Sequence, residues 1–70
     1  MSLSNSTEFI AKRAANNLTA LAYLVNAKHF GVPAGNHPED PVGGNRDTKI
    51  AALWTVIEAD SAALKAIYNP

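Results

Sequence analysis

Residues that could bind an anion lie close together in the middle of the chain: Gly43, Gly44, Arg46, Thr48 and Lys49. Glycines just before a helix leave free N–H groups at the positive end of the helix dipole, where an anion such as a phosphate can bind. The two cations and the hydroxyl group would add further contacts. The segment lacks the Gly-Lys-Ser/Thr ending of a phosphate-binding loop. Ordinary loop and cap chemistry is therefore the alternative interpretation.

Two charged residues, Lys28 and Asp60, fall in phase with apolar stripes. A charge in a buried seam costs stability unless it is paired or hydrated. In an antiparallel hairpin, Asp60 would lie nearest the level of residues 13–18. An Arg13–Asp60 or Lys28–Asp60 pair between chains could therefore fix the register of an assembly. Alternatively, each charge lies at the edge of its stripe and reaches water.

Other reactive groups are sparse. His29, His37, Glu39 and Asp40 could ligate a metal, but their spacing matches neither a zinc nor a calcium site. The chain has no cysteine, so it forms no disulfide and no thiolate metal site. No Ser, His and Asp set stands in a recognisable catalytic context. We expect no metal, no cofactor and no enzymatic activity.

Two helices are predicted to position these residues, over about residues 7–28 and 46–67. Neither segment contains proline or glycine, and Asn45 or Asp47 can cap the second helix. Apolar residues recur every three or four positions, as on one face of a helix. In the first helix these are Ala11, Ala14, Leu18, Leu21 and Val25, and in the second they are Ile50, Leu53, Ile57, Leu64 and Ile67.

The second helix carries another stripe of mostly small residues. Small side chains let another helix approach closely, but alanine also has the highest helix propensity, which would explain the stripe without any contact. The residues are Ala52, Val56, Ala59, Ala63 and Ala66.

Residues 29–45 hold three prolines and all four glycines of the chain. Neither a helix nor a central strand tolerates this density. A loop this long in a small domain is often ordered and functional, although it can also be a flexible connector.

The chain is short of core. A domain of 70 residues buries only about 60% of its unfolded surface, and small domains compensate with disulfides, metals or self-association. We therefore predict one all-α domain over residues 1–70, an antiparallel two-helix hairpin that assembles into a homo-oligomeric bundle. Trp54 could anchor that interface or cover the edge of the core. The expected interface residues are Leu18, Leu21, Val25, Ile50, Leu53, Trp54, Ile57 and Leu64.

Charge and hydropathy argue against two classes of function, nucleic-acid binding and membrane binding. Six basic residues balance six acidic ones, which argues against nucleic-acid binding, because such binding relies on cations at phosphates. The chain also lacks a polybasic cluster, a run of about 18 apolar residues and a signal peptide. We expect a cytoplasmic protein that contacts neither membrane nor nucleic acid.

The order of a capped helix, a Pro/Gly loop and a second helix opening near Arg46 resembles the hairpin domain of phage anti-CBASS and anti-Thoeris proteins. That family sequesters cyclic-nucleotide immune signals. The resemblance implies a viral homo-oligomer in the host cytoplasm, which holds a nucleotide-like ligand between protomers without turnover. The local likeness lies in Thr55-Val56-Ile57-Glu58, similar to that family's Thr-x-Leu-Glu, and in the helix end Ala62-Ala63-Leu64-Lys65-Ala66-Ile67.

Two hypotheses therefore compete. The first is a non-enzymatic oligomer that sequesters an anionic, nucleotide-like small molecule. The second is a protein-interaction module or inhibitor that docks one helix face on a larger partner.

Overall fold

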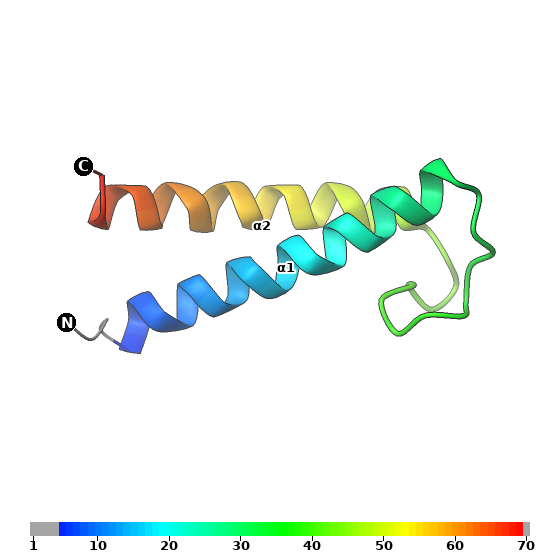
Figure 1. The fold of residues 1–70 in the computed structure, drawn as a ribbon, viewed down its shortest axis with the longest axis horizontal. Coiled ribbons are helices and arrows are strands. Elements are labelled where there is room, and N and C mark those ends of the chain that lie inside the picture. The colour runs from blue at the N-terminus through cyan, green and yellow to red at the C-terminus, as the bar shows by residue number, and fades with distance from the viewer. Residues whose placement is uncertain (1–4, 70) are drawn as a thin grey trace.

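The computed structural model describes residues 5–69, which form two helices joined by a long loop. Helix α1 spans Asn5–His29 and helix α2 spans Arg46–Ile67, with no strand among the described residues. The helices pack side by side, and the start of α1 and the end of α2 both lie at the end of the hairpin opposite the loop (Figure 1). The predicted all-α hairpin is confirmed.

Local hydrogen bonds and backbone conformation account for the start of α2 and the end of α1. The side-chain oxygen of Asn45 accepts the Thr48 N–H at 3.1 Å and caps α2, as one of the two expected caps. After α1, Gly31 has a φ of 67°, and the Val32 N–H returns to the Ala27 carbonyl at 2.9 Å. Such a left-handed glycine is the usual way to terminate a helix.

The core is small and lies toward the loop end of α1. The buried apolar residues of the described chain are Ala20, Leu21, Leu24, Ala27 and Ile57. The stripe predicted for α1 is therefore partly wrong, since Leu18 and Val25 are exposed and Leu24 is fully buried. The face of α1 that is buried instead runs through Ala20, Leu21, Leu24 and Ala27, and of these only Leu21 belongs to the predicted stripe. The small side chains of the two alanines allow α2 to approach closely.

The molecule is elongated, with extents of 43 × 18 × 17 Å and a radius of gyration of 14.3 Å. A compact domain of this length would have a radius of about 11 Å. Two helices side by side cannot form a rounder body, because each has only one neighbour to cover it. Much of the apolar surface consequently stays uncovered.

Candidate functional site

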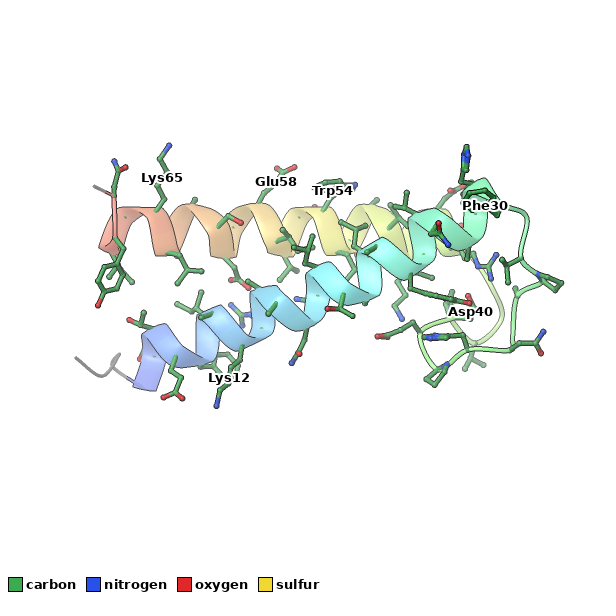
Figure 2. All side chains as sticks on the ribbon, viewed as in Figure 1. Lys12, Phe30, Asp40, Trp54, Glu58 and Lys65 are labelled. Atoms are coloured by element: carbon green, nitrogen blue, oxygen red, sulfur yellow. The ribbon has the colours of Figure 1, made fainter. Side chains whose placement is uncertain are left out.

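The Asp40 carboxylate lies at the centre of a polar cluster at the loop end of the hairpin (Figure 2). Arg46 donates from Nε at 2.8 Å and from Nη2 at 3.2 Å, the Gly35 N–H donates at 3.0 Å and the Tyr23 hydroxyl at 3.3 Å. The Asp40 side chain is only 1% exposed. We call Tyr23, Gly35, Asp40 and Arg46 the Asp40 cluster.

Arg46 also holds the start of the loop. Its Nη1 donates to the Val32 carbonyl at 2.6 Å, and its Nη2 lies 3.5 Å from the Pro33 carbonyl. One guanidinium group thus joins both ends of residues 32–46. The hydrogen bonds from Arg46 keep the pKa of Asp40 below its ordinary value against the opposing effect of burial, and the same contact raises the pKa of Arg46.

Two further contacts fix the part of the loop next to this cluster. The His37 ring stacks on the Tyr23 ring with centroids 3.7 Å apart, and its Nδ1 accepts the Glu39 N–H at 3.0 Å. Lys49 donates from α2 to the Glu39 carbonyl and lies 3.5 Å from its carboxylate. The loop is therefore held by side chains from both helices.

The five residues predicted to bind an anion lie within the first turn of α2 and just before it. Gly43 and Gly44 have positive φ values of 77° and 65°, and the Gly44 N–H donates to the Pro41 carbonyl. The Thr48 N–H is taken by the Asn45 cap, while Arg46 and Lys49 contact Asp40 and Glu39. An anion here would have to compete with carboxylates of the chain itself, so the loop site stays a prediction.

A second charged contact crosses between the helices. Arg13 donates to both Asp60 oxygens, from Nε at 2.9 Å and from Nη2 at 2.7 Å, and the Asp60 side chain is buried. The hydrogen bonds from Arg13 lower the pKa of Asp60, and the pKa of Arg13 is raised. Sequence analysis placed Asp60 at the correct level, but the Arg13–Asp60 pair lies within one chain. Lys28 instead pairs with Asp47 and reaches water.

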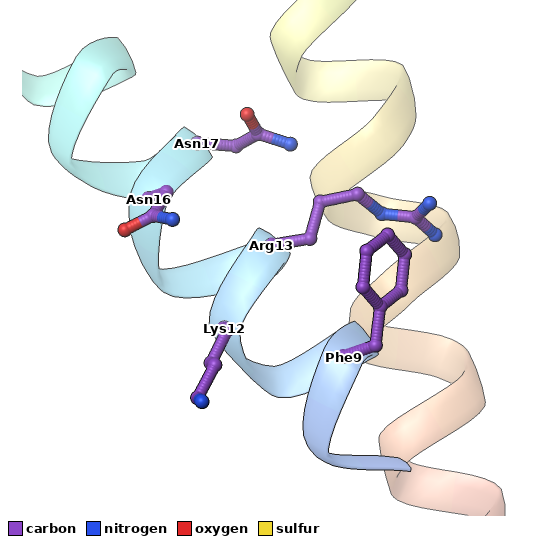
Figure 3. A pocket seen from close by; sticks show the side chains of 5 residues that line it. All are labelled: Phe9, Lys12, Arg13, Asn16 and Asn17. Carbon is purple, nitrogen blue, oxygen red and sulfur yellow. The ribbon is translucent and has the colours of Figure 1, made fainter. Parts of the chain in front are cut away.

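An open hollow of about 410 Å³ lies beside this ion pair on α1 (Figure 3). The Arg13 guanidinium stands 5.1 Å from the centre of the Phe9 ring, and Lys12 lies 3.3 Å from the Glu8 carboxylate. An aromatic face with cations and amides can hold a planar anionic group by stacking and hydrogen bonding. Sequence analysis missed this site, although its residues recur at helical spacing: Phe9, Lys12, Arg13, Asn16 and Asn17.

The predicted interface residues separate into two groups. Leu21 and Ile57 are buried within the hairpin, and Ile50, Leu53 and Leu64 are half-buried along its seam. These five residues serve the core of the single chain. Leu18, Val25 and Trp54 remain 54%, 46% and 48% exposed.

These three exposed residues lie on one side of the hairpin. Tyr23 and Lys49 mark the opposite side, because they contact the adjacent loop residues Asp40 and Glu39. At 100° per residue, Leu18 and Val25 fall on the flank of α1 away from Tyr23, and Trp54 falls on the flank of α2 away from Lys49. We call Leu18, Val25 and Trp54 the Trp54 face.

The described residues show neither a cluster of metal ligands nor a membrane-spanning helix. Within residues 5–69, no three His, Cys, Asp or Glu side chains gather as a metal site would need. Neither described helix is both long and apolar enough to cross a membrane. Comparisons of the chain with models of known protein families, with curated proteins and with solved structures found no match.

Proposed function

We propose that the chain is a non-enzymatic binding protein that works as an assembly of helical hairpins. The Trp54 face carries this proposal, because three large apolar side chains remain about half exposed although the described core holds only five buried apolar residues. Contiguous apolar patches on small proteins usually mark interaction sites. In the assembly, the Pro/Gly-rich loop closes each hairpin and neighbouring hairpins cover the apolar surface.

We further propose that the assembly sequesters a nucleotide-like anion without turnover, in the cytoplasm of a host cell if the protein is viral. The hollow beside Phe9 supports this proposal, since it offers an exposed ring for stacking and the Lys12 ammonium for charge. The predicted loop site around Arg46 is the second location, where an anion would compete with Asp40.

Native mass spectrometry of protein purified from cells tests both parts together. We expect a mass that is a multiple of the 7.4 kDa chain, with a retained small molecule. A single unliganded chain at micromolar concentration would contradict the assembly.

A panel of cyclic nucleotides then tests the ligand and its site. A ligand that binds only the folded state raises the melting temperature, by several degrees at concentrations far above its Kd. Phe9→Ala should abolish the shift, whereas Phe30→Ala, which removes another exposed ring at the loop end, should retain it. Loss of the shift only in Lys49→Ala would move the site to the loop. No shift with any nucleotide would overturn sequestration of these compounds.

The alternative proposal is a module that docks on a larger partner. The same Trp54 face supports it, because an exposed tryptophan is a common centre of protein interfaces. Sizing distinguishes the two, since a docking module would remain a single folded chain in isolation. A stable oligomer in which Trp54 is shielded would argue against a larger partner at this face.

A further inference from the structure

We infer that His37 is a pH-sensitive switch in the loop: the neutral ring binds the Glu39 N–H, and the protonated ring releases Glu39 and, with it, Lys49 of α2. The switch needs neither a ligand nor a second chain. It depends on two contacts of one imidazole ring. The ring stacks on Tyr23 of α1, with centroids 3.7 Å apart and planes inclined by 16°, and its Nδ1 accepts the Glu39 N–H at 3.0 Å.

The hydrogen bond to Nδ1 exists only while the ring is neutral. A neutral imidazole has one nitrogen that accepts and one that donates, whereas an imidazolium ion carries a proton on both nitrogens. Since Nδ1 of His37 accepts a backbone N–H, a proton on this atom would point at the Glu39 N–H and exclude the bond. Histidine is the side chain that ordinarily changes its charge between about pH 5 and 8. A mild fall in pH therefore breaks this contact.

The stacking on Tyr23 responds to charge in a different way. A cation above the face of a tyrosine ring is attracted by the electrons of that ring, so an imidazolium keeps its place on Tyr23. The Tyr23 hydroxyl donates to Asp40 at 3.3 Å, which keeps the phenol in position. Protonation therefore leaves the His37 ring on α1 and detaches the Glu39 N–H from it.

The charged side chains next to His37 are already paired. In the described part of the loop and the first turn of α2 they form two ion pairs, Asp40–Arg46 and Glu39–Lys49. On the side of α1, Tyr23 is the titratable group that packs against the ring. Both carboxylates are thus bound to a cation, and neither is free to accept the new N–H of an imidazolium and hold the turn in its place.

The release is local to Glu39. The Asp40 N–H donates to the His37 carbonyl and the Gly35 N–H donates to the Asp40 carboxylate, both at 3.0 Å, and neither bond involves the ring. Glu39 is held by the His37 ring on one side and by Lys49 on the other, which donates to its carbonyl and lies 3.5 Å from its carboxylate. Loss of the first contact loosens the second. Lys49 belongs to the predicted loop site, so pH would regulate a cation of that site; this consequence alone rests on the proposed function.

A pH titration followed by NMR tests the switch in the unmodified chain. Between about pH 8 and 5 we expect the Glu39 N–H signal to shift upfield in step with the ring protons of His37, because the hydrogen bond is lost. The nuclear Overhauser effect between the His37 and Tyr23 rings should persist. His29, whose ring packs edge-on against Phe30, is the internal control. A Glu39 signal that does not follow the His37 ring would overturn the proposal.

Two variants separate the acceptor from the ring. In His37→Asn, Oδ1 replaces Nδ1 and accepts the N–H two residues on, as asparagine does in turns, but it does not titrate. The Glu39 signal should then stay at its hydrogen-bonded position throughout the titration. In His37→Phe the ring still stacks on Tyr23 but has no acceptor, so the signal should stay at its released position. A shift with pH in His37→Asn equal to that of the unmodified chain, or identical Glu39 signals in the two variants, would contradict the switch.

Discussion

Asp40 and Arg46 together determine how the loop is held. The carboxylate accepts hydrogen bonds from Arg46, Tyr23 and the Gly35 N–H, and Arg46 also reaches the Val32 carbonyl. Every buried side-chain nitrogen and oxygen of the described residues has a partner. A fully satisfied polar network of this kind specifies one conformation, because breaking any part leaves buried groups without partners.

Replacing this carboxylate should release the loop. We expect Asp40→Asn to lower the melting temperature by several degrees, because an amide cannot accept all four hydrogen bonds and leaves Arg46 without its counterion. Amide hydrogen exchange at Gly35 should also accelerate. Glu39→Gln, at the neighbouring and more exposed position, is the control and should change little. Unchanged exchange at Gly35 in Asp40→Asn would contradict this role.

The lowered pKa values of Asp40 and Asp60 set a direction for the pH dependence of stability. Because the folded state binds these protons more weakly than the unfolded state, the stabilisation is complete above the ordinary pKa of 3.8. It is lost as pH falls through the lower folded pKa values. The melting temperature should therefore decline below about pH 4. The double variant Asp40→Asn, Asp60→Asn should show a flatter acid limb, and equal limbs would be evidence against the assignment.

At the residue scale, sequence reasoning identified several of the charged residues that form these contacts, but it predicted their partners less well. It singled out Arg46 and Lys49 as cations near a helix start, and Asp60 as a charge in an apolar stripe. It could not show that Asp40 lies beside Arg46, since the five irregular loop residues 41–45 separate them and no periodicity fixes such a path. The hollow at Phe9 was within reach of a spacing argument, but was missed.

At the scale of the elements, the helix boundaries follow from local signals. Proline and glycine exclude the loop from both helices, and α2 begins at Arg46 as expected after the Asn45 cap. The last residue of α1, His29, lies one position beyond the expected end. The side that each helix presents to the other was harder to predict, because α1 is apolar over a wide arc. Leu24 and Leu18 lie on different parts of that arc, and only packing against α2 decides between them.

Substitution of Leu24 tests how the two helices pack. Leu24→Ala should lower the free energy of unfolding by about 2–5 kcal/mol, because it removes a fully buried side chain and leaves a cavity. Val42→Ala, at an exposed loop position, should change it by less than about 0.5 kcal/mol. Urea denaturation of both variants at one protein concentration measures the difference. Similar midpoints for the two variants would mean that the seam around Leu24 is not the main core.

The whole molecule combines a small core with a large surface. Its radius of gyration and its exposed area both exceed the values of a compact protein of the same mass. The short chain and its few large apolar residues already predicted a small core. The sequence could not show where the uncovered surface lies, because the register of the two helices depends on ion pairs between residues far apart in the chain.

The dependence of the melting temperature on protein concentration tests the central claim most directly. If folding is coupled to association of hairpins, mass action stabilises the folded state at higher concentration. We predict that the melting temperature rises steadily as the protein is concentrated from the low micromolar to the millimolar range. A cooperative transition at the same temperature throughout that range, with the mass of a single 7.4 kDa chain, would contradict the account.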